Sequence, residues 1–238
     1  MKRIKTFSKA KIAAKYLIVL SFLFFGCSTK YIKFVPSDNE IYTTDRLSSF
    51  LNVNKNPKVV LRTPAISSQT TEEEDISYIY SAIEKQLLSD GFVVRDRNLF
   101  NQVVSNNQNT VDYAQLKTKT DTDLIIELIK LDTEVIYETN QYSTDRGKSG
   151  LLDKPYKQYG AAVEFKVVLI DNNEFAGTYK FNYAPCSKGL GCEINESFKD
   201  RMKRIEKKKE GYVTVEKDIL EEFIRNATAK LVSDMREG

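Results

Sequence analysis

The 238-residue chain contains 36 lysines and arginines, 33 aspartates and glutamates, and no histidine. The lack of histidine excludes histidine-based catalytic triads and most zinc enzymes, and it removes the usual acid–base group that titrates near neutral pH. Six of the basic residues lie within the first fifteen positions, so residues 27–238 carry 30 basic side chains against 33 acidic ones. This slightly acidic remainder gives no indication of a nucleic-acid partner.

The amino-terminal segment has the pattern of an export signal. Its basic head is followed by an apolar run over residues 16–25 and then by Gly26 and Cys27. The basic residues of the head are Lys2, Arg3, Lys5, Lys9, Lys11 and Lys15. A cysteine directly after a small residue resembles the lipobox of bacterial lipoproteins. The resemblance implies that residues 1–26 are cleaved and that the Cys27 thiol is acylated, and we expect no cofactor besides this covalent lipid.

The alternative interpretation of residues 16–25 is an uncleaved transmembrane helix. Ten helical residues rise only about 15 Å, which is half of a hydrocarbon core of about 30 Å. Acylation of Cys27 is therefore the better explanation. Several acyl chains together hold a protein firmly on a bilayer, so this residue is predicted to suffice as an anchor. Ser28 follows it, in place of the aspartate that is associated with inner-membrane retention, which favours the periplasmic side of the outer membrane.

Residues 27–57 are predicted to form a flexible, lipid-anchored tether. Their apolar side chains occur singly and without a sustained period, so they cannot bury enough surface to offset the entropy of ordering the chain. Such a tether would let a domain stand away from the membrane. The remaining residues, 58–238, have the length of one globular domain.

The first half of the predicted domain alternates strands and helices. A short β-branched run predicts a buried strand over residues 58–64, and apolar residues at helical spacing predict a helix over residues 72–90. Gly91 is expected to end that helix in a left-handed conformation. A short strand over residues 92–96 follows. Two further helices are predicted over residues 97–106 and 112–119.

The second half is dominated by strands. A strand over residues 123–137 begins apolar on both faces, as expected for a central strand that is covered on both sides. Residues 139–158 are polar and contain two glycines and a proline, which predicts a loop. Alternating apolar residues then predict strands over residues 159–170 and 175–183.

Cys186 and Cys192 are predicted to form a disulfide. Export places them in an oxidising compartment, and the five intervening residues, two of them glycine, can bend back to the required Cα separation. A metal site is the alternative, but it would have two thiols and no histidine. A redox-active pair fits less well because the Cys-x-x-Cys spacing is absent.

The carboxyl-terminal region begins with a basic segment and ends with a helix. The segment is a candidate contact surface for anionic lipid or an acidic envelope polymer, and a solvated helix or loop is the alternative. Its basic residues are Lys199, Arg201, Lys203, Arg204, Lys207, Lys208 and Lys209. Residues 212–215 are predicted to form an edge strand, and residues 216–236 show the spacing of an amphipathic helix.

Residues 81–97 have the pattern of a helix, a small loop and a strand that ends in an acidic residue and arginine, here Asp96 and Arg97. This pattern resembles the CsgG family, whose superfamily also holds the LpoB-type penicillin-binding-protein activators and the amino-terminal domain of TolB. Residues 121–127 resemble the entry to the family's third strand. Residues 159–171 resemble the strand that follows and its turn.

The resemblance spans about residues 58–185 and implies an α+β fold, with a mixed sheet of about five strands flanked by helices and preceded by the tether. It carries over no catalytic residue. It implies a non-enzymatic accessory module of an envelope assembly, of the peptidoglycan-synthase-activator or secretion-accessory kind. Such a module would bind a periplasmic protein partner or a second copy of itself.

Two other functions compete with this one. A subunit of a CsgG-like secretion channel would need strands with one apolar alternate face, and residues 133–142 are polar on both faces. An enzyme would need its carboxylates to accompany a nucleophile, a phosphate loop or a ligand set. The candidate pairs, Asp121 with Asp123 and Glu134 with Glu138, have no such companion in the sequence.

Overall fold

The structure, a computed structural model, describes residues 28–62, 73–98, 100, 113–171, 173–194 and 215–238. Within these ranges eight strands form one sheet. The strands are β1 (Lys30–Ile32), β2 (Glu40–Thr43), β3 (Lys58–Arg62), β4 (Val93–Val94), β5 (Leu124–Thr144), β6 (Ser149–Leu169), β7 (Glu174–Tyr183) and β8 (Cys192–Glu193). The described helices are α2 (Asp45–Val53), α3 (Glu73–Ser89), α5 (Tyr113–Thr120) and α7 (Lys217–Glu237). The α+β class predicted from the sequence is confirmed.

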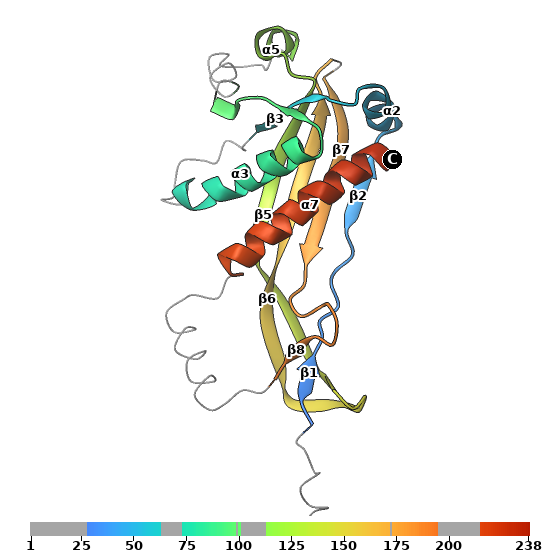
Figure 1. The fold of residues 1–238 in the computed structure, drawn as a ribbon, viewed down its shortest axis with the longest axis vertical. Coiled ribbons are helices and arrows are strands. Elements are labelled where there is room, and N and C mark those ends of the chain that lie inside the picture. Colours follow the sequence, from blue (N-terminus) through green and yellow to red (C-terminus); the bar gives the residue numbers. More distant parts are fainter. Residues whose placement is uncertain (1–27, 63–72, 99, 101–112, 172, 195–214) are drawn as a thin grey trace, which may run out of the picture.

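The sheet has two parts that share the β5–β6 hairpin (Figure 1). In the first part, the head, the strand order is β4-β3-β5-β6-β7-β2, and β3 runs parallel to β4 and β5 while the other pairs are antiparallel. In the second part, the arm, which we define as residues 132–160 together with β1 and β8, the hairpin extends beyond the described helices (Figure 1). There β1 takes the free edge of β5, and β8 pairs with β1. The described part of the molecule is therefore elongated, with its helices at one end.

The main core lies between one face of the head sheet and the helices α3, α7 and α2. Every second residue of the central strands points into it, as the period of a β-strand requires. From the sheet these buried residues include Val59, Leu61, Leu124, Ile126, Val163, Phe165, Val167, Tyr179 and Phe181. The buried residues of α7 recur every three or four positions: Leu220, Phe223, Ile224, Ala227, Thr228, Leu231, Val232 and Met235. Both long helices predicted from apolar spacing are confirmed.

The opposite face of the head sheet is apolar at one end and charged in the middle. Phe100 is 1 % exposed and packs there with residues of β3, β5 and β6. Further along, the Glu127 carboxylate lies between Arg62, at 3.9 Å, and Lys166, at 3.8 Å. Opposite charges on neighbouring strands stabilise a solvated sheet face. None of the described helices is both long enough and apolar enough to cross a bilayer.

The structure corrects the prediction of a tether over residues 27–57. From Ser28 onward this segment is part of the fold, because β1 and β2 join the sheet and α2 packs on the core. Thr44 caps α2: its hydroxyl accepts a hydrogen bond from the Leu47 backbone N–H at 3.4 Å and donates one to the Ala176 carbonyl at 3.1 Å. Four apolar side chains that appear isolated in the sequence are buried in the fold: Ile32, Phe34, Leu47 and Leu51. Their partners include residues more than a hundred positions away, in β5, β7 and α7.

Two further predictions need correction. The polar stretch over residues 139–158 is strand rather than loop, apart from the turn between β5 and β6. The sheet has eight strands rather than about five. Its short edge strands are held mainly by main-chain hydrogen bonds and bury few side chains, so they leave little apolar pattern in the sequence. Gly91 has the expected positive φ, at 89°. The predicted helix over residues 97–106 and strand over residues 212–215 lie mostly outside the described residues.

The stability of the head should fall in alkali because of Tyr179. Its fully buried hydroxyl forms a hydrogen bond with the Thr43 hydroxyl at 2.8 Å, and burial raises its pKa to about 12. The raised pKa contributes stability that is complete below the ordinary tyrosine value of about 10 and is lost as pH rises toward 12. When the pH is raised from about 9 to about 11, the unfolding free energy of wild type should fall by about 1 kcal/mol more than that of Tyr179→Phe. Urea unfolding at the two pH values measures the difference. Equal losses in the two proteins would contradict this assignment.

Candidate functional site

The arm has a small core of its own. Ile32 and Phe34, from the segment around β1, are buried against Tyr137 of β5 and Ala184, which follows β7. Tyr142, Leu152 and Tyr156 of the hairpin pack around this cluster. On the other face of the hairpin, the Glu138 carboxylate pairs with Lys157 at 2.8 Å. The arm is thus a packed structure with one apolar and one polar face.

Gly160 joins the arm to the head. A Cβ atom at this position would lie 2.2 Å from the Tyr183 carbonyl oxygen and 2.5 Å from the Tyr137 ring. We expect Gly160→Ala to cost about 1–3 kcal/mol of unfolding free energy, because backbone and ring must both shift. Gly150→Ala is the control: its Cβ would meet the ring of Tyr142, a side chain near the turn. Chemical denaturation of both variants measures the difference, and a larger loss at Gly150 would contradict it.

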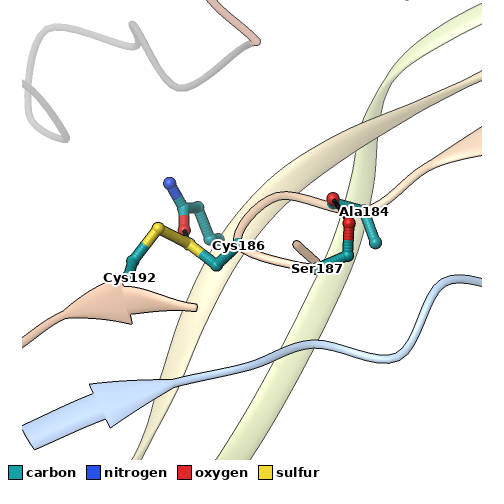
Figure 2. Close-up of a disulfide and its surroundings, with 5 residues drawn as sticks. Ala184, Cys186, Ser187 and Cys192 are labelled. Carbon is teal, nitrogen blue, oxygen red and sulfur yellow. Dashed lines mark hydrogen bonds between the residues drawn. A yellow bond between two sulfur atoms is a disulfide. The ribbon is translucent and has the colours of Figure 1, made fainter. Parts of the chain in front are cut away.

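The predicted cysteine pair has the geometry of a disulfide. The sulfur atoms of Cys186 and Cys192 are 1.97 Å apart and the Cα atoms 5.0 Å apart. Figure 2 shows the loop between them, in which the Ser187 hydroxyl donates to the Ala184 carbonyl at 2.9 Å. Gly191 has φ of 94° and lies against the Ile32 carbonyl, where a Cβ would clash at 1.9 Å. Cys192 lies in β8 and pairs with Ile32 of β1, so the disulfide ties β8, beside β1, to the segment after β7.

Replacing both cysteines by serine should cost about 2 kcal/mol, the chain-entropy value for a loop this short. The loss should come from the arm, because the bridge joins the end of β7 to β8, and β8 pairs with β1. Hydrogen exchange should therefore quicken at β1 and β8 in the double variant and stay unchanged in α7. Hydrogen exchange that becomes faster uniformly across the chain would contradict a local stabilisation of the arm by the disulfide.

The arm ends where the described chain begins. The Ser28 hydroxyl donates to the Asp145 carboxylate at 2.8 Å, and the Asp145 backbone N–H donates to the Thr29 carbonyl at 3.3 Å. Lys30 then pairs with Thr144 of β5, and its ammonium group lies 4.5 Å from the Tyr142 ring centre. We call residues 28–31 and 141–154 the tip. Sequence patterns could not reveal the tip, because its contacts join segments over a hundred residues apart.

The other predicted site residues have different positions. Cys27 lies outside the described residues, but it is bonded directly to Ser28. The seven basic residues of the carboxyl-terminal segment also lie outside them: Lys199, Arg201, Lys203, Arg204, Lys207, Lys208 and Lys209. Within the described ranges, no three histidine, cysteine, aspartate or glutamate side chains lie close enough together to hold a metal ion.

The carboxylates considered as candidate acids have structural partners. Asp121 has a φ of 50° and pairs with the Lys58 ammonium group at 2.7 Å and with the Arg95 guanidinium. The hydrogen bond from Lys58 lowers the pKa of Asp121 below its usual value, with both positive charges contributing. Asp123 accepts a hydrogen bond from the Lys58 backbone N–H at 2.9 Å. Both aspartates thus fasten the start of β3 to the loop before β5.

An exposed aromatic pair lies at the β2 edge of the head. This pair was not predicted from the sequence. Tyr42 and Phe175 are stacked with ring centres 6.1 Å apart and are 58 % and 42 % exposed. Ile41, beside Tyr42, is 43 % exposed. β2 is the outermost strand of the described sheet on this side. The signal in the sequence was the apolar pair at 41 and 42 within a polar segment.

No protein-family profile matches the chain, and no curated protein matches it in sequence. Among solved structures, the chain is similar to the PelC dodecamer from Paraburkholderia phytofirmans, at 10 % identity and a TM-score of 0.36, covering 84 % of this chain and 96 % of that one. The dodecamer of a single-substitution PelC variant from the same organism gives 11 % identity, a TM-score of 0.38 and coverage of 84 % and 98 %. A PDZ domain protein from Parabacteroides distasonis is similar at 10 % identity and a TM-score of 0.30, and the match covers 87 % of this chain and 41 % of that one.

Proposed function

We propose that the chain is a lipoprotein of the outer membrane, anchored on the periplasmic side through Cys27, and that it acts as a non-enzymatic, protein-binding accessory of an envelope assembly. The signal-like residues 1–26 and the cysteine after them support the anchor. The observation that carries the proposal is that the chain enters the fold directly after Cys27, at the end of the arm remote from the helices. An anchor there leaves the head accessible to a partner.

The exposed β2 edge supports a protein as that partner. Aromatic side chains are enriched at protein interfaces, and Tyr42 and Phe175 present two stacked rings to solvent. The outer edge of β2 offers main-chain groups that an extended segment of a partner can pair with. The partner is a second protein or a second copy of this chain. The resemblance to the LpoB-type activators supports the same role.

The anchor is tested by labelling growing cells with radioactive palmitate. We expect label in the wild-type protein, none in Cys27→Ser, and sedimentation of the labelled protein with the outer membrane. An unlabelled wild type that keeps residues 1–26 would end the proposal.

The docking surface is tested by placing a photoreactive amino acid at position 42 in intact cells. Position 53 is the control, because Val53 is 89 % exposed but lies on α2. We expect a discrete protein adduct from position 42, none from position 53, and loss of the adduct when Phe175→Ser removes the neighbouring ring. Equal adducts from both positions, or an adduct insensitive to Phe175→Ser, would count against a surface at the β2 edge.

A further inference from the structure

We infer that the tip is a membrane-contacting surface. Its residues touch the anionic phospholipid headgroups of the same bilayer in which Cys27 is anchored. The inference builds on the proposed acylation of Cys27 and adds to it a second, non-covalent contact made by folded residues. It also sets the orientation of the protein on the membrane.

The length of chain between the anchor and the fold carries the inference. The Ser28 hydroxyl donates to the Asp145 carboxylate beside the turn between β5 and β6. Consecutive Cα atoms are about 3.8 Å apart, so an anchor on Cys27 is attached one residue away from this contact. Acyl chains on the Cys27 sulfur must enter the hydrocarbon core beneath the headgroups. An anchor this close to the turn therefore brings the tip into the headgroup layer.

The charge of the tip fits this position. It contains four basic residues, Lys30, Arg146, Lys148 and Lys154, against the acidic Asp145 and Asp153. The remainder of residues 27–238 has 26 basic and 31 acidic side chains, so the tip is positive in an otherwise negative protein. All four basic side chains are exposed. Basic groups next to a lipid anchor are attracted to anionic headgroups.

One apolar side chain of the tip also suits an interface. Leu151 is 68 % exposed, although it lies in β6 opposite Gln141 and close to the turn. A single exposed leucine is ordinary on a protein surface, but here it lies among basic residues at the anchored end. Leucine with flanking cations is the combination that enters the headgroup boundary in interfacial segments.

The orientation that follows is upright. The start of β5 is tied to α2 through Asn54 and Asp123, and from there to Thr144 the strand has 20 steps at about 3.3 Å each, roughly 60 Å along a twisted strand. The head thus lies at the end remote from the bilayer (Figure 1), and Val53 belongs to its helix α2.

The test uses the acylated full chain reconstituted in vesicles of phosphatidylcholine and phosphatidylglycerol. An environment-sensitive fluorophore is attached to Leu151→Cys, and to Val53→Cys as the matched control, since the natural cysteines are acylated or in a disulfide. Lipids with a nitroxide on the headgroup quench nearby fluorophores. We expect quenching at position 151 to be several-fold greater than at position 53, and to fall when Lys148→Glu is added.

The outcomes separate the inference from the function on which it rests. Flotation of wild type, but not of Cys27→Ser, with the vesicles shows that the anchor works. If the protein floats and position 151 is not quenched, the tip does not contact the lipid and the inference is overturned while the anchor stands. Equal quenching at both positions overturns the upright orientation. Quenching at position 151 that does not change when Lys148→Glu is added overturns the contact with lipid phosphate. Failure of wild type to float removes the proposed anchor, and the inference with it.

Discussion

Phe165→Ala should lower the unfolding free energy of the full chain by about 3–5 kcal/mol, the range measured for large aromatic truncations in packed cores. Phe165 is fully buried on β6, the strand between β5 and β7, and its ring lies 6.4 Å from that of Phe181. The cavity opens beneath the helices, where the strands on both sides fix the backbone and prevent collapse. Urea unfolding followed by circular dichroism gives the difference.

Phe175→Ala provides the matched control, because it removes the same kind of side chain from an exposed position on β7 of the same sheet. Phe175 is 42 % exposed and stacks on Tyr42. Losing that pair should cost about 1 kcal/mol. Similar losses for both phenylalanines would mean that the core is not centred between the sheet and α7.

Leu47→Ala should cost about 2–5 kcal/mol, although the residue lies in a stretch that has the sequence pattern of a tether. Leu47 is fully buried in the main core, and α2 packs on α7 and β7. If residues 27–57 were a flexible tether, the same substitution would have no effect on stability. Thermal and urea unfolding of the full chain therefore decide between the two descriptions.

Val53→Ala is the companion variant on the same helix. Its side chain is 89 % exposed, so the change should stay within about 0.5 kcal/mol of wild type. A large loss from this variant, or none from Leu47→Ala, would show that α2 is not packed as described.

The elements that could be predicted well from sequence are those whose burial is periodic. The amphipathic spacing in α3 and α7 and the apolar runs of β3 and early β5 reflect contact with one large core, so they are visible locally. β2 has no buried residue, and β1 has one, Ile32. These strands are defined by pairing with β7 and β5, and no local pattern encodes a partner so distant in sequence.

Within the arm, residues 139–158 have the sequence pattern of a loop, because Gly150 and Pro155 usually interrupt strands. In the structure the Tyr142 ring packs over Gly150, and Pro155 lies where the register between β5 and β6 shifts. The strand tolerates both residues there. The disulfide could be predicted because the cysteine spacing and the expected export suffice for it, whereas the tip depends on the Ser28–Asp145 contact.

The contacts of β2 with β7 and α7 have a consequence for how the protein is made. The Thr43 hydroxyl, near the start of the chain, donates to the Asp234 carbonyl in α7 at 3.4 Å, and β2 needs β7 before it can form at all. A chain that emerges amino terminus first must therefore hold its early segments unpaired until nearly all of it has been synthesised. Contacts of such long sequence separation make folding slow. During that interval the early β-segments keep unpaired main-chain hydrogen-bonding groups, and such exposed edges are prone to aggregate.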